Sequence, residues 1–207
     1  MRPYPELIEE LKQADPVLAI VHDHMEREFH PTPSIDVYYY LLNSIVSQQL
    51  SVKVADVIWH RLLDLFPDRY PHSNELMNTS DEVLRSIGLS RQKIGYLKNV
   101  ADFSDEYGMD FEMLDDWTDA EIIKYLSQIK GVGKWTVQMI LMFPMDRPNV
   151  FPVDDLGIQT KMKHFYQLKT DKKELRQQLE KIAENWDPFK TVASKLLWSA
   201  QIPKEKR

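Results

Sequence analysis

The sequence contains no cysteine, only six glycines among 207 residues, and no run of eighteen apolar residues. Without cysteine the chain cannot form disulfides, zinc fingers or iron–sulfur clusters, and it has no thiol nucleophile. Any catalytic group must therefore be an oxygen or nitrogen group. The missing apolar run argues against a membrane-spanning helix, and the first twenty residues mix charge with proline where a signal peptide needs an apolar segment. We expect a soluble intracellular protein.

Composition and charge indicate a folded chain with an uneven charge distribution. Apolar residues make up 43% of the chain and aromatic residues 11%, enough for a real core. The net charge of −6 by itself argues against a nucleic-acid partner, since lysine and arginine hold polyanions. However, residues 1–120 carry 10 Lys/Arg and 22 Asp/Glu, whereas residues 121–207 carry 16 and 10. A polyanion should bind the C-terminal part, although the imbalance is also compatible with ordinary solvated helices.

Apolar residues recur with a helical period along most of the chain, which predicts an all-α protein. A thick apolar stripe covers residues 34–66, helix-start signals precede residues 81 and 119, and Gly88 marks a helix end. There is no fixed-period repeat and no low-complexity linker. We expect eight to ten helices, arranged as two helical lobes flanking a cleft.

The stretch "LSQIKGVGKWTVQMIL" (residues 126–141) places two glycines around one apolar residue between two helical segments. Gly131 and Gly133 would allow positive φ and close approach by another backbone. The free N–H groups at the start of the second helix would form an anion-binding site. Lys130 and Lys134 add positive charge to it. A plain helix–helix turn would explain the two glycines alone.

Two adjacent aspartates, Asp154 and Asp155, lie between a loop that contains Pro148 and Pro152 and a predicted helix that begins near Leu156. Aspartate is a good helix N-cap, so one of the pair is expected to be structural. Our interpretation is that Asp154 caps or positions the helix while Asp155 projects into the cleft. The alternative is that both are ordinary caps.

Together these motifs resemble the helix-hairpin-helix (HhH-GPD) DNA glycosylase superfamily, and most closely its 3-methyladenine DNA glycosylase II branch. The resemblance runs from about Pro33 to Trp198. It is carried, in the family's order, by "LLNSIVSQQLSVKVADVIWHRL", "IGLSRQKIGYLKNVA", "IKGVGKWTVQMIL", "FPVDDLGI" and "WDPFKTVASKLLW". The implied organisation is one glycosylase unit over residues 1–207, with one subdomain over roughly 33–117 and the other from residues 1–32 and 118–207. The hairpin would occupy residues 126–140.

The resemblance implies the following site residues. The catalytic residue is Asp155, the second of the pair. The hairpin grips DNA phosphates through backbone amides, and the residues implied in DNA binding are Lys130, Gly131, Val132, Gly133, Lys134, Thr136, Gln49, Leu50, Leu89 and Lys93. Of these, Gln49 would plug the gap left by a flipped base and Leu89 would wedge into the opposite strand. A monovalent cation, Na⁺ or K⁺, would bind the backbone carbonyls of Ser127, Ile129 and Val132.

A base pocket is implied around Trp135 and Trp198, which match base-stacking tryptophans of the family, although core packing is the usual role of tryptophan in helices. A cation over an indole face gains about 0.5–2 kcal/mol, which would favour electron-poor bases. Gln48 could equally turn toward the base. At least one ring of the run Tyr38–Tyr40 should face the cleft, and Tyr40 is the one that we assign to the pocket. Met139 occupies the position of an aromatic pocket residue in some relatives.

The departures from the family predict a hydrolase without lyase activity. Trp135 stands where bifunctional relatives carry a lysine nucleophile, so Schiff-base chemistry lacks its amine. No iron–sulfur cluster and no other cofactor is expected. The implied partner is double-stranded DNA with a damaged base. The protein would be a monomer without membrane contact, in the cytoplasm or nucleoid of a bacterium or the nucleus of a eukaryote.

The implied function is release of alkylated purines such as 3-methyladenine and 7-methylguanine in base excision repair, with Asp155 stabilising an oxocarbenium-like sugar. Two alternatives remain: a DNA-binding module without chemistry, and a glycosylase for another damaged or mismatched base. Separately, His22, Glu26 and His30 have the spacing of a metal-binding helix face, which ordinary packing also explains.

Overall fold

The structure is a computed structural model that describes residues 2–26 and 36–203. Within these residues the regular elements are helices, accompanied by one isolated bridge between Met25 and Ala200, and the predicted all-α class is confirmed. None of the helices in these two ranges is long and apolar enough to cross a bilayer. The chain forms two compact units: a central unit (residues 33–145) and a terminal unit (residues 1–32 and 146–207).

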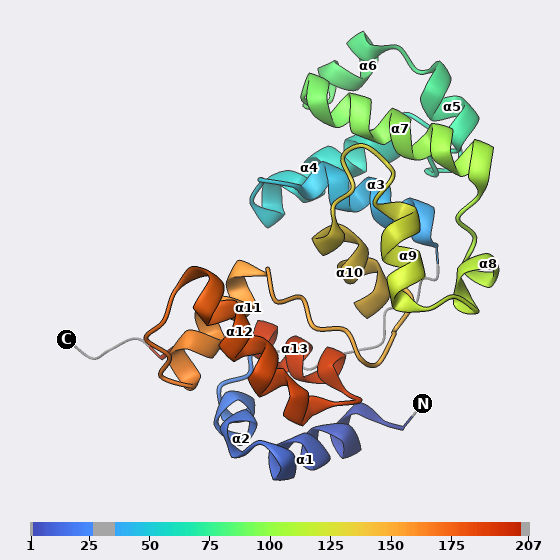
Figure 1. Cartoon of the computed structure of the whole chain (residues 1–207). Helices are drawn as coiled ribbons and strands as arrows, with labels where there is room; N and C mark the ends of the chain where they lie inside the picture. Colours follow the sequence, from blue (N-terminus) through green and yellow to red (C-terminus); the bar gives the residue numbers. More distant parts are fainter. Residues whose placement is uncertain (1, 27–35, 204–207) are drawn as a thin grey trace. The chain divides into compact units, whose positions relative to one another are not determined.

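The central unit is built around its longest described helix, α7, against which α3, α5 and α6 pack (Figure 1). Helix α3 also packs on α4 and α10, and α10 packs on α9. The helices of this unit are α3 (Val37–Ser47), α4 (Val52–Leu63), α5 (Ser73–Asn78), α6 (Asp81–Ser86), α7 (Arg91–Tyr107), α8 (Phe111–Asp115), α9 (Asp119–Leu126) and α10 (Lys134–Met142).

Helix starts in the central unit follow from local capping chemistry. The Ser80 hydroxyl accepts the Val83 N–H at 3.3 Å at the start of α6. Thr118 and Glu121 form a reciprocal capping box at the start of α9, which satisfies two N–H groups that the helix itself cannot pair. Gly88 follows α6 with a φ of 108°, a conformation that favours glycine. These boundaries agree with the sequence-based expectations.

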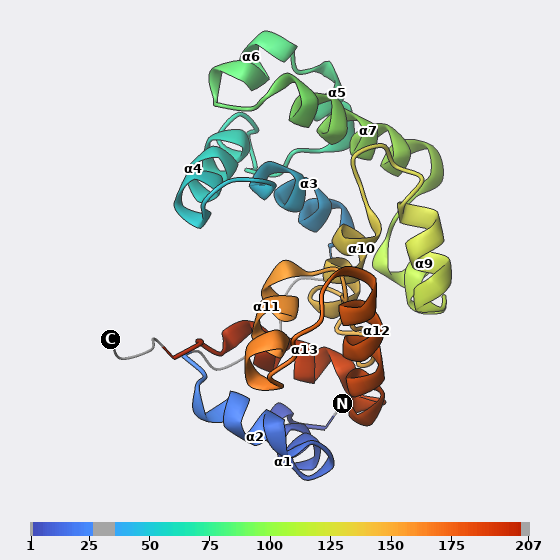
Figure 2. The same ribbon diagram turned by 60° about the vertical axis from the view of Figure 1, so that its left-hand side comes forward.

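The terminal unit combines both ends of the chain. Helix α13 packs on α1, α2 and α11, and Figure 2 shows α11 beside α13. The helices are α1 (Tyr4–Ala14), α2 (Pro16–Asp23), α11 (Leu156–Phe165), α12 (Lys172–Ala183) and α13 (Lys190–Ser199), with a 3₁₀ turn at Glu184–Trp186. The described residues thus contain thirteen α-helices rather than the eight to ten predicted. Helices as short as α5, α6 and α8 have five or six residues, too few to show a helical period.

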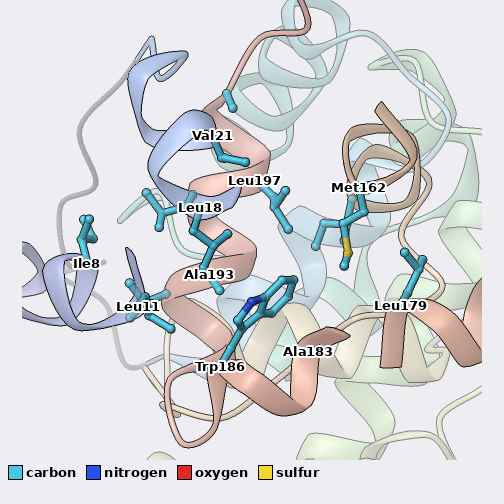
Figure 3. Packing of buried hydrophobic residues seen from close by; sticks show 14 of the residues in the cluster. Ile8, Leu11, Leu18, Val21, Met162, Leu179, Ala183, Trp186, Ala193 and Leu197 are labelled. Carbon is cyan, nitrogen blue, oxygen red and sulfur yellow. The ribbon is translucent and has the colours of Figure 1, made fainter. Parts of the chain in front are cut away.

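A fully buried tryptophan organises the core of the terminal unit. Figure 3 shows the indole of Trp186 surrounded by side chains from several helices, among them Leu11, Ala193 and Leu179. Its N–H donates to Oδ2 of Asp15 at 2.9 Å, and the Tyr166 hydroxyl donates to the same oxygen at 2.6 Å. A buried indole N–H without an acceptor would cost about 1–3 kcal/mol, so Asp15 stabilises this core as well as capping α2.

The boundary between the units lies later than the sequence predicted. The sequence predicts residues 118–145 in the subdomain of the chain ends, whereas α9 and α10 belong to the central unit. The reason is that α10 is buried over its last seven residues and packs on α3. The terminal unit resumes at Asp146, which accepts hydrogen bonds from the Tyr4 hydroxyl at 2.6 Å and the buried Lys195 ammonium at 3.0 Å. The correct boundary is therefore 145/146.

Candidate active site

The hairpin between α9 and α10 depends on one glycine with positive φ. Gly131 has a φ of 106°, and a Cβ there would lie 2.3–2.7 Å from ring carbons of Tyr96 on α7. No other residue fits this position. Gly133, in contrast, has a φ of −96°, and a Cβ there would meet nothing within 4 Å. The predicted positive φ is confirmed for Gly131 and wrong for Gly133, whose missing side chain leaves room for an approaching backbone.

The start of α10 has no side-chain cap. Gly133 is the N-cap and offers no side chain to bind the first-turn N–H groups. Lys130, Gly133 and Lys134 are exposed. Helix N-termini attract anions because the N–H groups and the helix dipole act together. The hairpin surface can therefore bind a phosphate, with two lysines adding positive charge.

Two side chains hold the hairpin backbone from within the central unit. The Asn99 amide of α7 donates to the Lys130 carbonyl at 3.0 Å, and the Gln48 amide after α3 lies 3.5 Å from the Gly131 carbonyl. Gln48, predicted to face the base, is thus half-buried beside the hairpin. Sequence reasoning missed Asn99, which lies 31 residues from its partner.

The predicted cation ligands can be compared with this geometry. The Ile129 carbonyl accepts the Val132 N–H at 3.0 Å, and a carbonyl oxygen has a second lone pair. Asn99 and Gln48 bind the carbonyls of Lys130 and Gly131 rather than those of the predicted ligands Ser127, Ile129 and Val132. The hairpin is therefore compatible with a monovalent cation bound by these carbonyls.

The loop between α3 and α4 exposes the predicted plug. Gln49 is exposed and has a φ of 58°, a backbone conformation that non-glycine residues rarely adopt. Leu50 beside it is 37% exposed and Val52 is 88% exposed. The loop thus presents a polar side chain next to apolar ones on the surface of the central unit.

Three residues predicted to bind DNA have side chains that are buried or bonded within the central unit. Leu89 is 4% exposed and packs in the core, so the prediction that it wedges into DNA is wrong for this structure. Thr136 is likewise buried, and only its backbone can contribute to the hairpin surface. The Lys93 ammonium donates to the Val46 carbonyl at 2.8 Å, near the C-terminal end of α3, and burial lowers its pKa. Lys93 therefore supports α3, where a cation complements the helix dipole.

The predicted base-pocket residues of the central unit differ in accessibility. Trp135 is 39% exposed at the start of α10, whereas Met139 is buried among core residues of the same helix, so the prediction that Met139 lines a pocket is not supported. Tyr40 is half-buried, and burial raises its pKa to about 12. Trp135 is thus the exposed one of the two α10 residues that were predicted to line the pocket.

In the terminal unit, Asp155 is the N-cap of α11. Its Oδ1 accepts the Ile158 N–H at 2.8 Å and the Trp198 indole N–H at 2.9 Å, and the residue is only 7% exposed. Asp154 is exposed and forms an ion pair with Arg176. The interpretation that Asp154 caps the helix is therefore wrong, since Asp155 does so. The cap and the indole fix the carboxylate at the positive end of the helix.

Trp198 is predicted to stack on the base, and in the structure its indole N–H binds Asp155. This bond joins residues 43 positions apart, so no local signal in the sequence could predict it. Gly157 is a second residue that the sequence analysis missed. A Cβ at this position would lie 3.1 Å from the Asp155 Oδ1 and 3.6 Å from the Trp198 Nε1. The absent side chain at Gly157 lets the indole and the carboxylate meet.

Of the predicted metal-binding set His22, Glu26 and His30, the last lies outside the described residues.

The hairpin and the capped aspartate define an all-helical protein of the helix-hairpin-helix class. Residues 42–185 match the model of the family described as "HhH-GPD superfamily base excision DNA repair protein". The chain belongs to this superfamily, as the motifs predicted.

Named relatives and solved structures agree with this assignment. The Schizosaccharomyces pombe DNA-3-methyladenine glycosylase 1 is 32% identical over 163 residues, which cover 78% of this chain and 71% of the relative. The solved S. pombe 3-methyladenine DNA glycosylase in complex with abasic DNA matches 93% of this chain and 95% of its own, with a TM-score of 0.81 and 28% identity. The Bacillus halodurans DNA-3-methyladenine glycosidase matches 95% and 88%, with a TM-score of 0.79 and 30% identity.

The share of a relative that this chain spans varies. A Bacillus subtilis relative is 30% identical over 168 residues, which cover 78% of this chain but only 58% of the relative.

Proposed function

We propose that this protein is a monofunctional DNA glycosylase that hydrolyses the N-glycosidic bond of alkylated, cationic purines such as 3-methyladenine and 7-methylguanine in base excision repair. The observation that carries the proposal is the fixed carboxylate of Asp155, held by the Ile158 N–H and the Trp198 indole N–H. Membership of the HhH-GPD superfamily and the named relatives support it.

The chemistry follows from the charge of the substrate. An alkylated purine such as 7-methylguanine carries a positive charge before cleavage and leaves as a neutral base, because it takes the electron pair of the bond to C1′. The sugar then has oxocarbenium character, and a nearby carboxylate stabilises this charge. Water adds to C1′ and releases a proton. Asp155 is the group that provides the negative charge and orients the water.

The hairpin of the central unit binds the DNA backbone in this proposal. The first-turn N–H groups of α10 bind a phosphate, and Lys130 and Lys134 add charge beside it. The target nucleotide leaves the base stack at a cost of a few kcal/mol. Gln49 and Leu50, exposed on the α3–α4 loop, fill the space that it leaves. Trp135 offers an aromatic face for a cationic base.

We also propose that a monovalent cation, Na⁺ or K⁺, binds the carbonyls of Ser127, Ile129 and Val132. Such an ion would supply positive charge next to a DNA phosphate. The protein's own contribution would be the hairpin turn, in which Gly131 has a φ of 106°.

The substrate class is tested by measuring which free bases are released. We expect release of methylated purines from methylated duplex DNA, and slower release of uracil or 8-oxoguanine from duplexes that contain them, because neutral bases gain less from an indole face and leave with a negative charge. Release of neutral bases only would contradict the alkylated-purine proposal.

Sodium borohydride is expected to trap no covalent adduct, since Trp135 replaces the lyase lysine, and a trapped adduct would refute the monofunctional assignment.

The glycine beside the carboxylate gives a second prediction. In Gly157→Ala the added Cβ would lie 3.1 Å from the Asp155 Oδ1, so the carboxylate or the helix must shift by a few tenths of an ångström. We expect base release to slow by about tenfold, because small displacements of a catalytic group have large effects. Alanine is the better helix former by about 0.8–1 kcal/mol, so the melting temperature should not fall.

Gly95→Ala is the matched control for this variant. Gly95 lies on α7, and a Cβ there would meet nothing within 4 Å. It should leave the single-turnover rate unchanged. A Gly157→Ala protein as active as the wild type would show that the space beside Asp155 is not needed for catalysis.

A further inference from the structure

The C-terminal end of α13 is held at several points within the terminal unit. The Ser199 carbonyl accepts the Glu26 N–H at 3.2 Å, and the Gln201 N–H donates to the His24 carbonyl at 2.9 Å. The last four carbonyls of a helix have no partner inside the helix, so such contacts fix its end. Trp198, whose indole binds Asp155, lies in this last turn.

Lys161 of α11 supplies a further contact to the same turn. Its ammonium donates to the Trp198 carbonyl at 2.5 Å. Trp198 is thus attached to α11 twice: by its backbone to Lys161 and by its indole to Asp155, the N-cap of that helix. The two attachment points are six residues apart, or about 9 Å along the helix axis. Two attachments on one helix restrict both the translation and the rotation of the indole.

The surroundings of Lys161 are charged and partly open. Burial lowers the pKa of Lys161, while the carboxylates of Asp155 and Glu26 oppose this shift. A cavity of about 390 Å³ lies beside it, lined by Glu26, Lys161, Trp198 and residues 199–202. The cavity leaves space for a side chain larger than lysine.

We infer that Lys161 is a positioning residue for Asp155, acting through the backbone and indole of Trp198. The inference rests on the proposed function, because it assigns to Lys161 the task of holding a catalytic carboxylate. Lys161 itself does not contact substrate in this mechanism. It keeps the last turn of α13 in place, so that the indole N–H stays at its 2.9 Å distance from Oδ1.

The test measures single-turnover base release from methylated duplex DNA for Lys161→Met, Trp198→Phe and the double variant. Lys161→Met removes the ammonium, and Trp198→Phe removes the indole N–H. We expect each single variant to lose about tenfold in rate, with the DNA dissociation constant within about twofold of the wild type. Because both act on the same carboxylate through one path, the double variant should be no slower than Trp198→Phe, within about twofold.

Two further variants separate positioning from general stability. Lys161→Arg keeps a cation and its donors and has room in the neighbouring cavity, so it should recover the rate to within about threefold of the wild type. Lys163→Met is the matched control on the same helix, since Lys163 binds the exposed Asp171 at 2.5 Å. It should leave the rate unchanged.

Failure of the positioning role and failure of the proposed function give different results in this assay. A wild-type rate for Lys161→Met, losses that multiply in the double variant, or rates that follow the melting temperatures would each overturn the role of Lys161. Asp155→Asn is measured in the same assay. If Asp155→Asn is inactive while Lys161→Met is fully active, only the positioning role fails. If Asp155→Asn is fully active, the catalytic role of Asp155 fails and the positioning role of Lys161 fails with it. If the wild type releases no methylated base, the proposed function fails.

Discussion

Asp155→Asn is expected to slow base release by at least about 100-fold while leaving the protein folded. The loss follows from the missing negative charge, because removal of one group that stabilises transition-state charge costs about 10²–10³ in rate. Asparagine caps helices as well as aspartate does, and its side-chain oxygen can still accept the N–H groups of Ile158 and Trp198. The free energy of unfolding should therefore change by less than about 1 kcal/mol.

The measurement is single-turnover release of methylated bases, together with DNA binding and thermal unfolding of the same variant. Asp154→Asn is the control, since Asp154 is the exposed neighbour that pairs with Arg176. Its rate should stay within about threefold of the wild type, as exposed ion pairs contribute little. Undiminished base release by Asp155→Asn would refute the catalytic role of this carboxylate. A protein that releases no base in either form but binds DNA would support the non-catalytic alternative.

Gly131→Ala is expected to disrupt the hairpin and weaken DNA binding by at least about tenfold. A non-glycine residue at its φ of 106° costs about 1–3 kcal/mol, and the new Cβ would lie 2.3–2.7 Å from the Tyr96 ring. The ring or the hairpin must move, which changes the direction of the first-turn N–H groups of α10. We also expect the free energy of unfolding to fall by at least about 2 kcal/mol.

Fluorescence anisotropy with a labelled duplex at fixed salt measures the binding change, and circular dichroism measures the stability. Gly95→Ala serves again as the control, because it adds the same methyl group on α7 next to Tyr96 without meeting another atom. Normal DNA affinity in a folded Gly131→Ala protein would show that the hairpin is not the DNA-binding element. Loss of stability with unchanged affinity would give the same conclusion.

Local signals explain why much of the fold could be predicted. The Thr118 capping box, the turn at Gly131 and the helix after Asp155 depend on residues within a few positions of each other. The sequence interpretation favours Asp154 as the cap, whereas the structure has Asp155, because two adjacent aspartates offer the same chemistry and only the backbone geometry decides between them. Sequence patterns therefore located the hairpin and the carboxylate but not the detailed hydrogen bonds.

Long-range contacts explain what could not be predicted. The bond from Trp198 to Asp155 spans 43 residues, and that from Lys161 to the Trp198 carbonyl spans 37. Leu89 follows a glycine in a loop-like sequence, yet packing in the central unit buries it. The boundary between the units was predicted near residue 117, but it lies at residue 145 because α10 packs on α3. Each of these features arises from tertiary packing, which has no local period in the sequence.

The arrangement of the two units also has a consequence for synthesis of the chain. The central unit is continuous, whereas α1 and α2 pack on α13, more than 160 positions later in the sequence. Because chains emerge from the ribosome at roughly 5–20 residues per second, the first two helices must wait for their partner while the intervening unit can already fold. During this interval the apolar faces of α1 and α2 lack α13, the helix on which they pack in the folded protein.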